Sequence, residues 1–224
     1  TLNIEAISIA EGKITDSGDK KGYAIGLLAS SAGHNVIDMG AGYDTMNVTA
    51  KGMNTTIGVS AGANRFGGWG STDTSKTIKN VEKMTVLAES RGGNAFGFAN
   101  DLGYAPNQYW EPGYKTGFNK VELGSDGEAA RVLNVTARAT GTDADKGNAH
   151  AVWANAQSGA PSDAGNSIIG SSTKSNNITL LAESVAGRAF GMVAEDGADR
   201  SNNYAGNSIQ GGSAADEIRI TANG

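Results

Sequence analysis

Apolar and polar residues alternate in several short segments of the chain, and these segments resemble one another. Residues 83–90 read KMTVLAES and residues 178–184 read ITLLAES, with apolar side chains at every second position. Alternation with a period of two is typical of a strand with one buried face, whereas a helix repeats its apolar positions every three to four residues. No stretch of ten or more residues has the helical pattern. We therefore predict an all-β fold with little or no helix.

The alternating segments recur at a nearly constant spacing. Their last apolar position is an alanine in six segments, at Ala10, Ala50, Ala88, Ala137, Ala182 and Ala222, with a mean spacing of about 42 residues. A short Asn-led segment precedes most of them, with Asn35, Asn80, Asn119, Asn166 and Asn207 at its start. A segment of small residues, such as GNAFGFAN or GRAFGMVAE, follows. Three short strands in each of about five repeats predict a three-sided parallel β-solenoid, in which each strand bonds to its counterpart about 4.8 Å away.

A β-sandwich is the alternative architecture, since it also uses alternating strands, but it has no need of a 42-residue period. The 33 glycines make up about 15% of the 224 residues and suit a chain with many sharp corners. We treat residues 1–224 as a single β-solenoid domain. The chain starts inside one alternating segment and stops just after another, without an amphipathic cap, so we expect a fragment of a longer repeat array.

Composition and charge argue against several classes of protein. The formal net charge is −5 and the charged residues are scattered, which does not favour binding to nucleic acid. No apolar run reaches the roughly 20 residues of a membrane helix, so we expect no membrane insertion. The chain has no cysteine and two isolated histidines, His34 and His150. Disulfides and zinc clusters are therefore not expected.

Two glycine-rich segments resemble the RTX nonapeptide, in which the pattern Gly-Gly-x-Gly-x-Asp precedes an apolar position. They are GAGYDTMNV, residues 40–48, and GGSAADEIRI, residues 211–220. The resemblance implies Ca²⁺ held between neighbouring turns by Asp carboxylates and backbone carbonyls, with Asp44 and Asp216 at the ligand positions. The two aspartates belong to distant repeats. We therefore expect structural turns and no cofactor, and calcium at these residues is the alternative.

The wider pattern of the repeat resembles the passenger repeats of very large bacterial surface adhesins. It runs Asn-x-Ile-x-Gly-Gly, then Asp-x-Ile-x-Ile-x-Ala, then Gly-x-Ala-x-Gly, and it covers nearly the whole chain. The resemblance implies export across a bacterial envelope and a location outside the cell or at its surface. On this basis we expect a non-catalytic structural or binding segment of a large exported adhesin-like protein.

The variable segments after the third strand of each repeat hold most of the aromatic residues. They are residues 62–79, 100–118, 155–165 and 195–206, and they contain eight of the 14 aromatic residues. Because they recur at one point of the coil, we expect them on one side of the stack, where exposed Tyr and Trp rings are typical of a binding surface. The candidates for binding a glycan or a surface protein are Trp69, Tyr104, Tyr109, Trp110 and Tyr114. The alternative is that these rings cover the flank of the solenoid.

The sequence contains no motif that predicts catalysis, and we expect that the protein is not an enzyme. Acidic residues occur in the loops, but no spacing recurs that would pair two carboxylates. A nucleophile elbow and a phosphate loop are also absent from the sequence. The alternative function is that of a carbohydrate-active β-helix, such as a polysaccharide lyase or a phage tailspike. End-to-end self-association through open strand edges is a further hypothesis.

Overall fold

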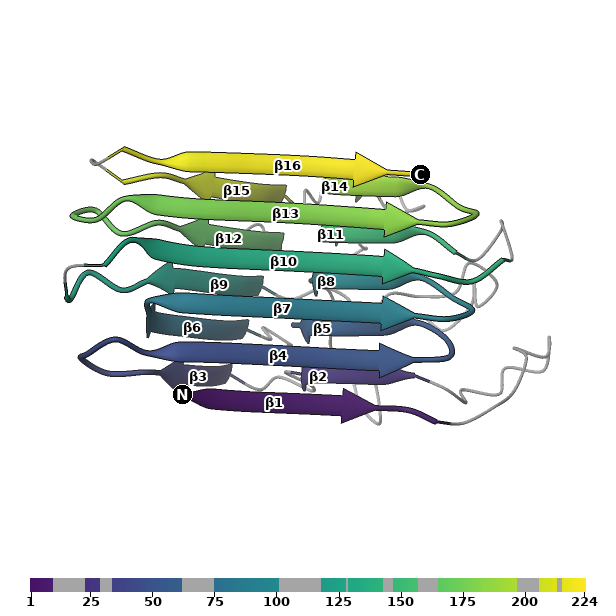
Figure 1. Cartoon of the computed structure of the whole chain (residues 1–224), viewed down its shortest axis with the longest axis horizontal. Helices are drawn as coiled ribbons and strands as arrows, with labels where there is room; N and C mark the ends of the chain where they lie inside the picture. Colours follow the sequence, from purple (N-terminus) through teal and green to yellow (C-terminus); the bar gives the residue numbers. More distant parts are fainter. Residues whose placement is uncertain are drawn as a thin grey trace.

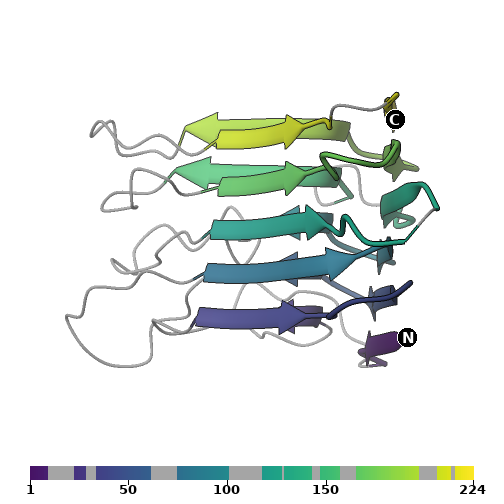
Figure 2. The ribbon, with the colours of Figure 1, turned by 90° about the vertical axis from the view of Figure 1, so that its left-hand side faces the viewer.

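Three parallel β-sheets run side by side and form the three sides of the molecule (Figures 1 and 2). The computed structural model describes residues 1–9, 23–28, 34–61, 75–100, 118–127, 129–142, 147–156, 165–196, 206–212 and 215–224. Within these ranges the regular secondary structure consists of β-strands, and no helix is present. The predicted all-β parallel solenoid is therefore confirmed. Among the same residues, no helix has the length and hydropathy needed to span a membrane.

Each coil contributes one strand to each sheet. Sheet A, which faces the viewer in Figure 1, contains β1 (Leu2–Ile7), β4 (Thr45–Gly52), β7 (Lys83–Ser90), β10 (Arg131–Ala139), β13 (Asn176–Ser184) and β16 (Glu217–Asn223). Sheet B contains β2 (Ala24–Leu28), β5 (Thr56–Ser60), β8 (Ala95–Ala99), β11 (Ala149–Ala156) and β14 (Ala189–Asp196). Sheet C contains β3 (His34–Asp38), β6 (Ser75–Val81), β9 (Phe118–Leu123), β12 (Gly165–Ile169) and β15 (Gly206–Gln210). After β1, the chain therefore completes five coils in the order B, C, A.

Equivalent positions of the repeat lie in columns along the axis. One column of sheet A contains Ala6, Ala50, Ala88, Ala137, Ala182 and Ala222. Five of the six predicted alanines are confirmed, but Ala6 takes the place predicted for Ala10, which lies outside the described residues. The alternation of this strand already ends at Ala6, whereas Ile7 and Ile9 of the segment ISIA lie in the opposite phase and are 56% and 86% exposed.

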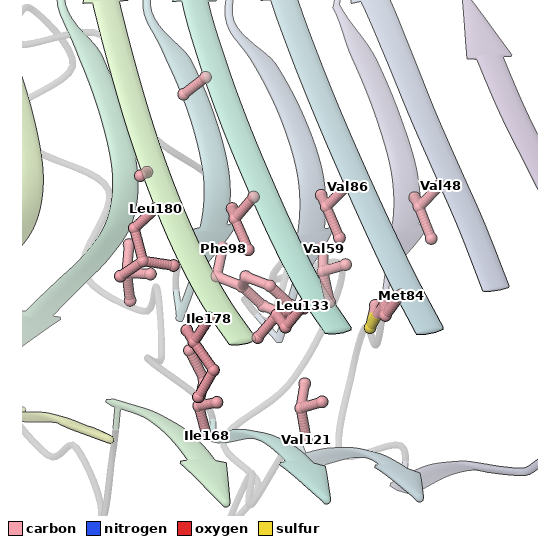
Figure 3. Packing of buried hydrophobic residues seen from close by; sticks show 14 of the residues in the cluster. Val48, Val59, Met84, Val86, Phe98, Val121, Leu133, Ile168, Ile178 and Leu180 are labelled. Atoms are coloured by element: carbon pink, nitrogen blue, oxygen red, sulfur yellow. The ribbon is translucent and has the colours of Figure 1, made fainter. Parts of the chain in front are cut away.

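The interior is filled by aliphatic side chains from all three sheets (Figure 3). Val48, Val86 and Val135 on sheet A are 0–1% exposed and form one cluster with Phe98 of sheet B and Ile168 of sheet C. Burying such a side chain contributes about 2 kcal/mol relative to leaving it in water. The apolar residues of the alternating pattern that predicted the strands thus form the inward face of sheet A.

Sheets A and B approach each other so closely that one column of sheet B has room for little more than glycine in most coils. A Cβ atom on Gly58 would lie 2.3 Å from Val86 Cγ1, and one on Gly97 would lie 2.3 Å from Val135 Cγ1. Both distances are far below van der Waals contact. This close approach explains the glycine in the middle of strands β5 and β8.

The corner between sheets A and B is closed by a serine in two of the coils. Gly93 N donates to Ser90 Oγ at 2.9 Å, and Gly187 N donates to Ser184 Oγ at 2.8 Å. Ser90 Oγ in turn donates to Asn54 O, one coil away, at 2.5 Å. The repeated sequence Glu-Ser-x-x-Gly therefore forms a turn whose serine also ties neighbouring coils together.

Candidate functional site

The loop side, where the chain passes from sheet B to sheet C, is the predicted binding surface. Residues 62–74, 101–117, 157–164 and 197–205 connect these two sheets in successive coils. Because the strands of both sheets are stacked in register, the points at which these segments leave and rejoin the stack follow rows along one side. The five candidate aromatic residues, Trp69, Tyr104, Tyr109, Trp110 and Tyr114, lie outside the described residues.

An aromatic column lies on the face of sheet B that points away from the interior of the coils. His150 stacks between Phe96 and Phe190, with ring centroids 4.8 Å apart on both sides. Trp153 lies 5.0 Å from Phe96. Phe96, His150 and Trp153 are only 3–6% exposed. This face of sheet B is therefore part of a second buried cluster and does not offer an open aromatic platform.

Burial determines the charge of the His150 imidazole. Desolvation by burial lowers the pKa of His150 to about 4, and its Nδ1 atom has no hydrogen-bond partner within the part of the chain that the structure describes. The imidazole is thus neutral near pH 7. Its stacked neighbours, Phe96 and Phe190, are uncharged. The geometry supports a packing role for this histidine.

An asparagine ladder runs along sheet C where each strand begins. Each side-chain amide donates to the backbone near the end of the preceding strand of sheet B: Asn119 Nδ2 to Ala99 O (2.7 Å), Asn166 Nδ2 to Trp153 O (2.8 Å) and Asn207 Nδ2 to Val193 O (2.6 Å). Each also donates to the next amide along the axis, Asn119 to Asn166 at 2.8 Å and Asn166 to Asn207 at 2.7 Å. The ladder therefore pins the two ends of each loop-side segment to the scaffold.

Lys76, not the predicted Asn80, occupies the second position of this ladder. Its column places Lys76 between Asn35 and Asn119. Asn80 lies at an irregularity near the end of β6, has a φ angle of 58°, and donates to Asp38 Oδ1 at 2.7 Å. The sequence NVEKM resembles NVIDMG at residues 35–40 because an asparagine precedes a valine in both, whereas a buried lysine gives no such signal.

The lysine leaves the ladder incomplete. Lys76 is 1% exposed, and its Nζ atom donates to Ser60 O at 3.3 Å. Burial lowers the pKa of Lys76 to about 7. On the next rung, Asn119 Oδ1 is buried and has no hydrogen-bond partner among the described residues, because the position that would supply an amide donor is held by lysine.

The corner between sheets C and A places one polar residue of each coil in a single column, directly before or at the start of the sheet A strand. From the first coil to the last, this column contains Asp44, Glu82, Arg131, Asn176 and Asp216. The two calcium candidates, Asp44 and Asp216, thus share a column but stand four coils apart. A sequence signal for this column exists, since the residue before each alternating segment is polar, but its type changes from coil to coil.

Asp216 accepts hydrogen bonds on both carboxylate oxygens. Oδ1 accepts from Asn176 Nδ2 at 2.7 Å and from Asn176 N at 2.9 Å, and Oδ2 accepts from Gly212 N at 2.7 Å. These bonds, above all the one from the Asn176 side chain, lower the pKa of Asp216. A calcium ion needs oxygen ligands, whereas the groups aimed at this carboxylate are N–H donors. The geometry favours a structural turn, and calcium at Asp44 and Asp216 stays a prediction.

The middle of the same column is fully buried. Glu82 Oε2 accepts from Asp44 N at 2.5 Å, while Glu82 Oε1 has no hydrogen-bond partner in the described ranges. The Arg131 guanidinium donates to the backbone carbonyls of Gly124, Asp126 and Ala129 and so closes its own turn. These side chains satisfy backbone groups of the corner. In the part of the chain that the structure describes, no three His, Asp or Glu residues gather into a metal site.

A shallow depression of about 480 Å³ lies at the corner between sheets A and B near the end of the chain. Arg138 and Glu183 line it, and Arg138 Nε lies 2.5 Å from Glu183 Oε2. Its charged side chains, Arg138 and Glu183, therefore pair with each other across the adjacent strands β10 and β13.

Comparisons with protein-family models, with curated proteins and with solved structures find no match to this chain.

Proposed function

We propose that the chain is a non-catalytic structural and binding segment of a large exported bacterial adhesin-like protein, located outside the cell or at its surface. In this proposal the three sheets are a rigid shaft, and the loop side contacts a glycan or a surface protein. The observation that carries the proposal is the row of connections between sheets B and C, which recurs on one side of an otherwise regular stack.

The asparagine ladder of sheet C supports these two roles, the sheets as the scaffold and the loop side as the binding surface. Asn119 joins its own strand to the carbonyl of Ala99, at the two ends of the segment 101–117, and Asn166 does the same for the segment 157–164. A loop whose two ends are held by a buried hydrogen bond is anchored on a rigid scaffold, which is how binding loops are commonly presented.

The test is binding of the 224-residue chain to a glycan array, with a loop-side variant and a matched control. Tyr109→Ala with Trp110→Ala removes two of the candidate rings, and we expect at least about a tenfold loss of affinity, since anchor residues each contribute more than about 1 kcal/mol. Tyr43→Ala is the control, because Tyr43 is an aromatic residue that is 56% exposed at the corner between sheets C and A. The control should bind like the unmodified chain.

Other results would change the proposal in defined ways. Equal binding by both variants would place the binding surface away from residues 109 and 110. A chain that binds no glycan and no surface protein would retain only the role of a spacer. Release of new reducing ends from a polysaccharide would favour the alternative, a carbohydrate-active β-helix.

A chelator experiment addresses the metal. If Asp44 and Asp216 hold structural turns, removing calcium leaves the melting temperature unchanged. A fall in melting temperature that calcium restores, and that Asp216→Asn abolishes, would show that the RTX-like turns bind the ion.

A further inference from the structure

The outer face of sheet A is a nearly flat surface along one side of the stack (Figures 1 and 2). The register runs without a bulge through β4, β7, β10 and β13, so their outward side chains stand in straight columns. Flat sheets of many strands are unusual and are typically stabilised by stacking against another layer. No described strand lies on this face. Because the face follows the side of the stack, it does not depend on where the stack begins or ends.

The middle of this face is uncharged. Two outward columns occupy it, and in the four strands β4, β7, β10 and β13 all of their side chains are half-buried. One column contains Asn47, Thr85, Asn134 and Thr179, and the next contains Thr49, Leu87, Thr136 and Leu181. A protein interface commonly has few charged residues in its middle and a polar rim around it. The composition of this face therefore suits contact with another protein surface.

A column of alternating charge runs along the margin of the face, next to the corner with sheet B. This charged column contains Lys51, Glu89, Arg138 and Glu183. All four side chains are exposed or half-exposed, although Arg138 Nε lies 2.5 Å from Glu183 Oε2. The sign of the charge changes at every coil, because β4 and β10 carry a cation and β7 and β13 carry an anion. The charged column is therefore complementary to itself when the order of the coils is reversed.

Two copies of this face fit each other in such a reversed order. A two-fold axis parallel to the strands, between β7 and β10, sets β7 against β10 and β4 against β13 of the second copy. Glu89 then lies opposite Arg138 of the other copy, and Lys51 lies opposite Glu183. A displacement by one strand would set Glu89 against Glu89 and Lys51 against Arg138, and like charges in such positions repel. Of the registers that avoid this repulsion, the one centred between β7 and β10 pairs all four charged strands.

The face has the area that a stable dimer needs. Sheet A has six strands. With strands about 4.8 Å apart and about seven residues, or about 23 Å, in length, the face measures roughly 650 Å². Two such faces bury roughly 1,300 Å² in total, and stable, specific interfaces begin at about 1,200 Å².

From these observations we infer that the chain forms a two-fold symmetric dimer with a second copy of itself through the outer face of sheet A. The two stacks lie side by side and run in opposite directions along the axis. Both copies use the same face, so the contact is isologous and closes as a dimer. The corner between sheets B and C lies opposite sheet A, so the loop sides of both copies stay free. The inference is independent of what the loop side binds.

Charge reversal tests the contact in solution, measured by sedimentation equilibrium. Glu89→Lys with Glu183→Lys makes the charged column entirely positive, and we expect at least about tenfold weaker dimerisation. Lys51→Glu with Arg138→Glu makes the column entirely negative, with the same expected loss. An equimolar mixture of the two variants should form a heterodimer at least as tightly as the unmodified chain dimerises. This recovery requires both variants to be folded, so it separates a lost contact from a misfolded chain.

The matched control makes the same change of net charge on sheet C. Asp38→Lys with Glu122→Lys also replaces two partly exposed carboxylates, which flank Lys79 in one column of that sheet. This variant should dimerise like the unmodified chain. An equal loss of dimer in this control would assign the effect to overall charge and would overturn the inference.

Cross-linking tests the register, since the chain has no cysteine of its own. In the inferred dimer, Asn47 of one copy lies opposite Thr179 of the other. A mixture of Asn47→Cys and Thr179→Cys chains should be joined by a bismaleimide that spans about 10 Å, the distance between stacked sheets. Asn47→Cys alone should not be cross-linked, because the two copies of residue 47 are also displaced by three strands, or about 14 Å, along the stack.

Three further results would overturn the inference. The first is a chain that sediments as a monomer up to its solubility limit. The second is efficient cross-linking of the Asn47→Cys chain with itself, which would show that the faces meet in another orientation. The third is a monomeric chain whose charge-reversed variants lose binding on a glycan array, which would assign the face to a glycan and not to a second copy.

Discussion

The side chain of Lys76 interrupts the asparagine ladder of sheet C, and its replacement should stabilise the fold. In Lys76→Asn the new amide can donate to Ser60 O and to Asn119 Oδ1, which is buried and unpaired among the residues that the structure describes. Satisfying a buried acceptor is expected to contribute about 1–3 kcal/mol. We therefore expect a higher free energy of unfolding for Lys76→Asn at pH 7, measured by urea denaturation.

The same variant should change how stability depends on pH. Burial lowers the pKa of Lys76 to about 7 in the folded chain, whereas an unfolded lysine keeps its proton up to about 10.4. Between these values the unfolded state binds more protons, so stability of the unmodified chain rises with pH by up to about 1.4 kcal/mol per unit. Lys76→Asn should lose this rise, whereas Lys79→Asn, which removes an exposed lysine paired with Asp38, should keep it. Identical slopes in Lys76→Asn and the unmodified chain would contradict the assignment.

His150 makes a corresponding prediction in acid. Burial lowers the pKa of His150 to about 4, against about 6.5 in the unfolded chain. The unfolded state therefore binds more protons between these values, and stability falls as the pH drops from about 6.5 to about 4. His150→Phe keeps the stack with Phe96 and Phe190 and should remove this part of the acid sensitivity in thermal melts at pH 4–7.

The exposed histidine provides the control for this variant. His34 accepts or donates a hydrogen bond with Ser75 Oγ at 2.7 Å on the surface of sheet C. His34→Gln should leave the acid sensitivity between pH 4 and 6.5 in place. If His150→Phe and His34→Gln melt alike across this range, the buried imidazole is not responsible.

At the scale of the element, the glycine column of sheet B is matched to the residues that face it. The column reads Gly26, Gly58, Gly97, Ala151 and Gly191, and the facing column of sheet A reads Val48, Val86, Val135, Leu180 and Ile220. The coil with an alanine is the coil in which a leucine replaces a residue branched at Cβ. Loss of the β-branch leaves room for one methyl group where sheets A and B meet.

This pairing predicts a non-additive double variant. Gly97→Ala would bring its Cβ to 2.3 Å from Val135 Cγ1 and 2.5 Å from Ala151 O, and we expect a loss of about 2 kcal/mol or more in the free energy of unfolding. Val135→Leu in the same chain should recover part of this loss, with a coupling of at least about 1 kcal/mol in a double-mutant cycle. Gly206→Ala is the control, since no atom lies within 4 Å of its added Cβ. Additive losses would show that the two columns are not matched.

The elements also show which parts of the fold can be predicted from the sequence. The columns at Ala88, Ala137 and Ala182 were predictable, because inward positions of a repeated strand are restricted to apolar residues of similar size. The positions of Ala6 and Lys76 were not. The first depends on where an alternating segment stops, and the second is a polar residue whose burial is decided by neighbouring coils.

At the scale of the whole molecule, the candidate site was predictable only as a side of the stack. The loop-side segments were found from their aromatic content and their recurrence, and the described strands set their attachment points on one side. The corner column from Asp44 to Asp216 was not predicted, because Glu82 and Arg131 share no residue type with the two aspartates. These residues come into one column only through the stacking of the coils, and their spacing in the sequence does not reveal this column.

The stack itself is tested most directly by distances along one column of sheet A. Spin labels at cysteines replacing Asn3 and one of Asn47, Thr85, Asn134, Thr179 or Arg219 would lie one to five strands apart. The distances are measured by pulsed electron paramagnetic resonance in an excess of unlabelled chain. We expect about 19 Å for the Asn3–Thr179 pair and about 24 Å for the Asn3–Arg219 pair, because each strand adds about 4.8 Å. Distances that do not increase with the number of coils would contradict the in-register parallel solenoid.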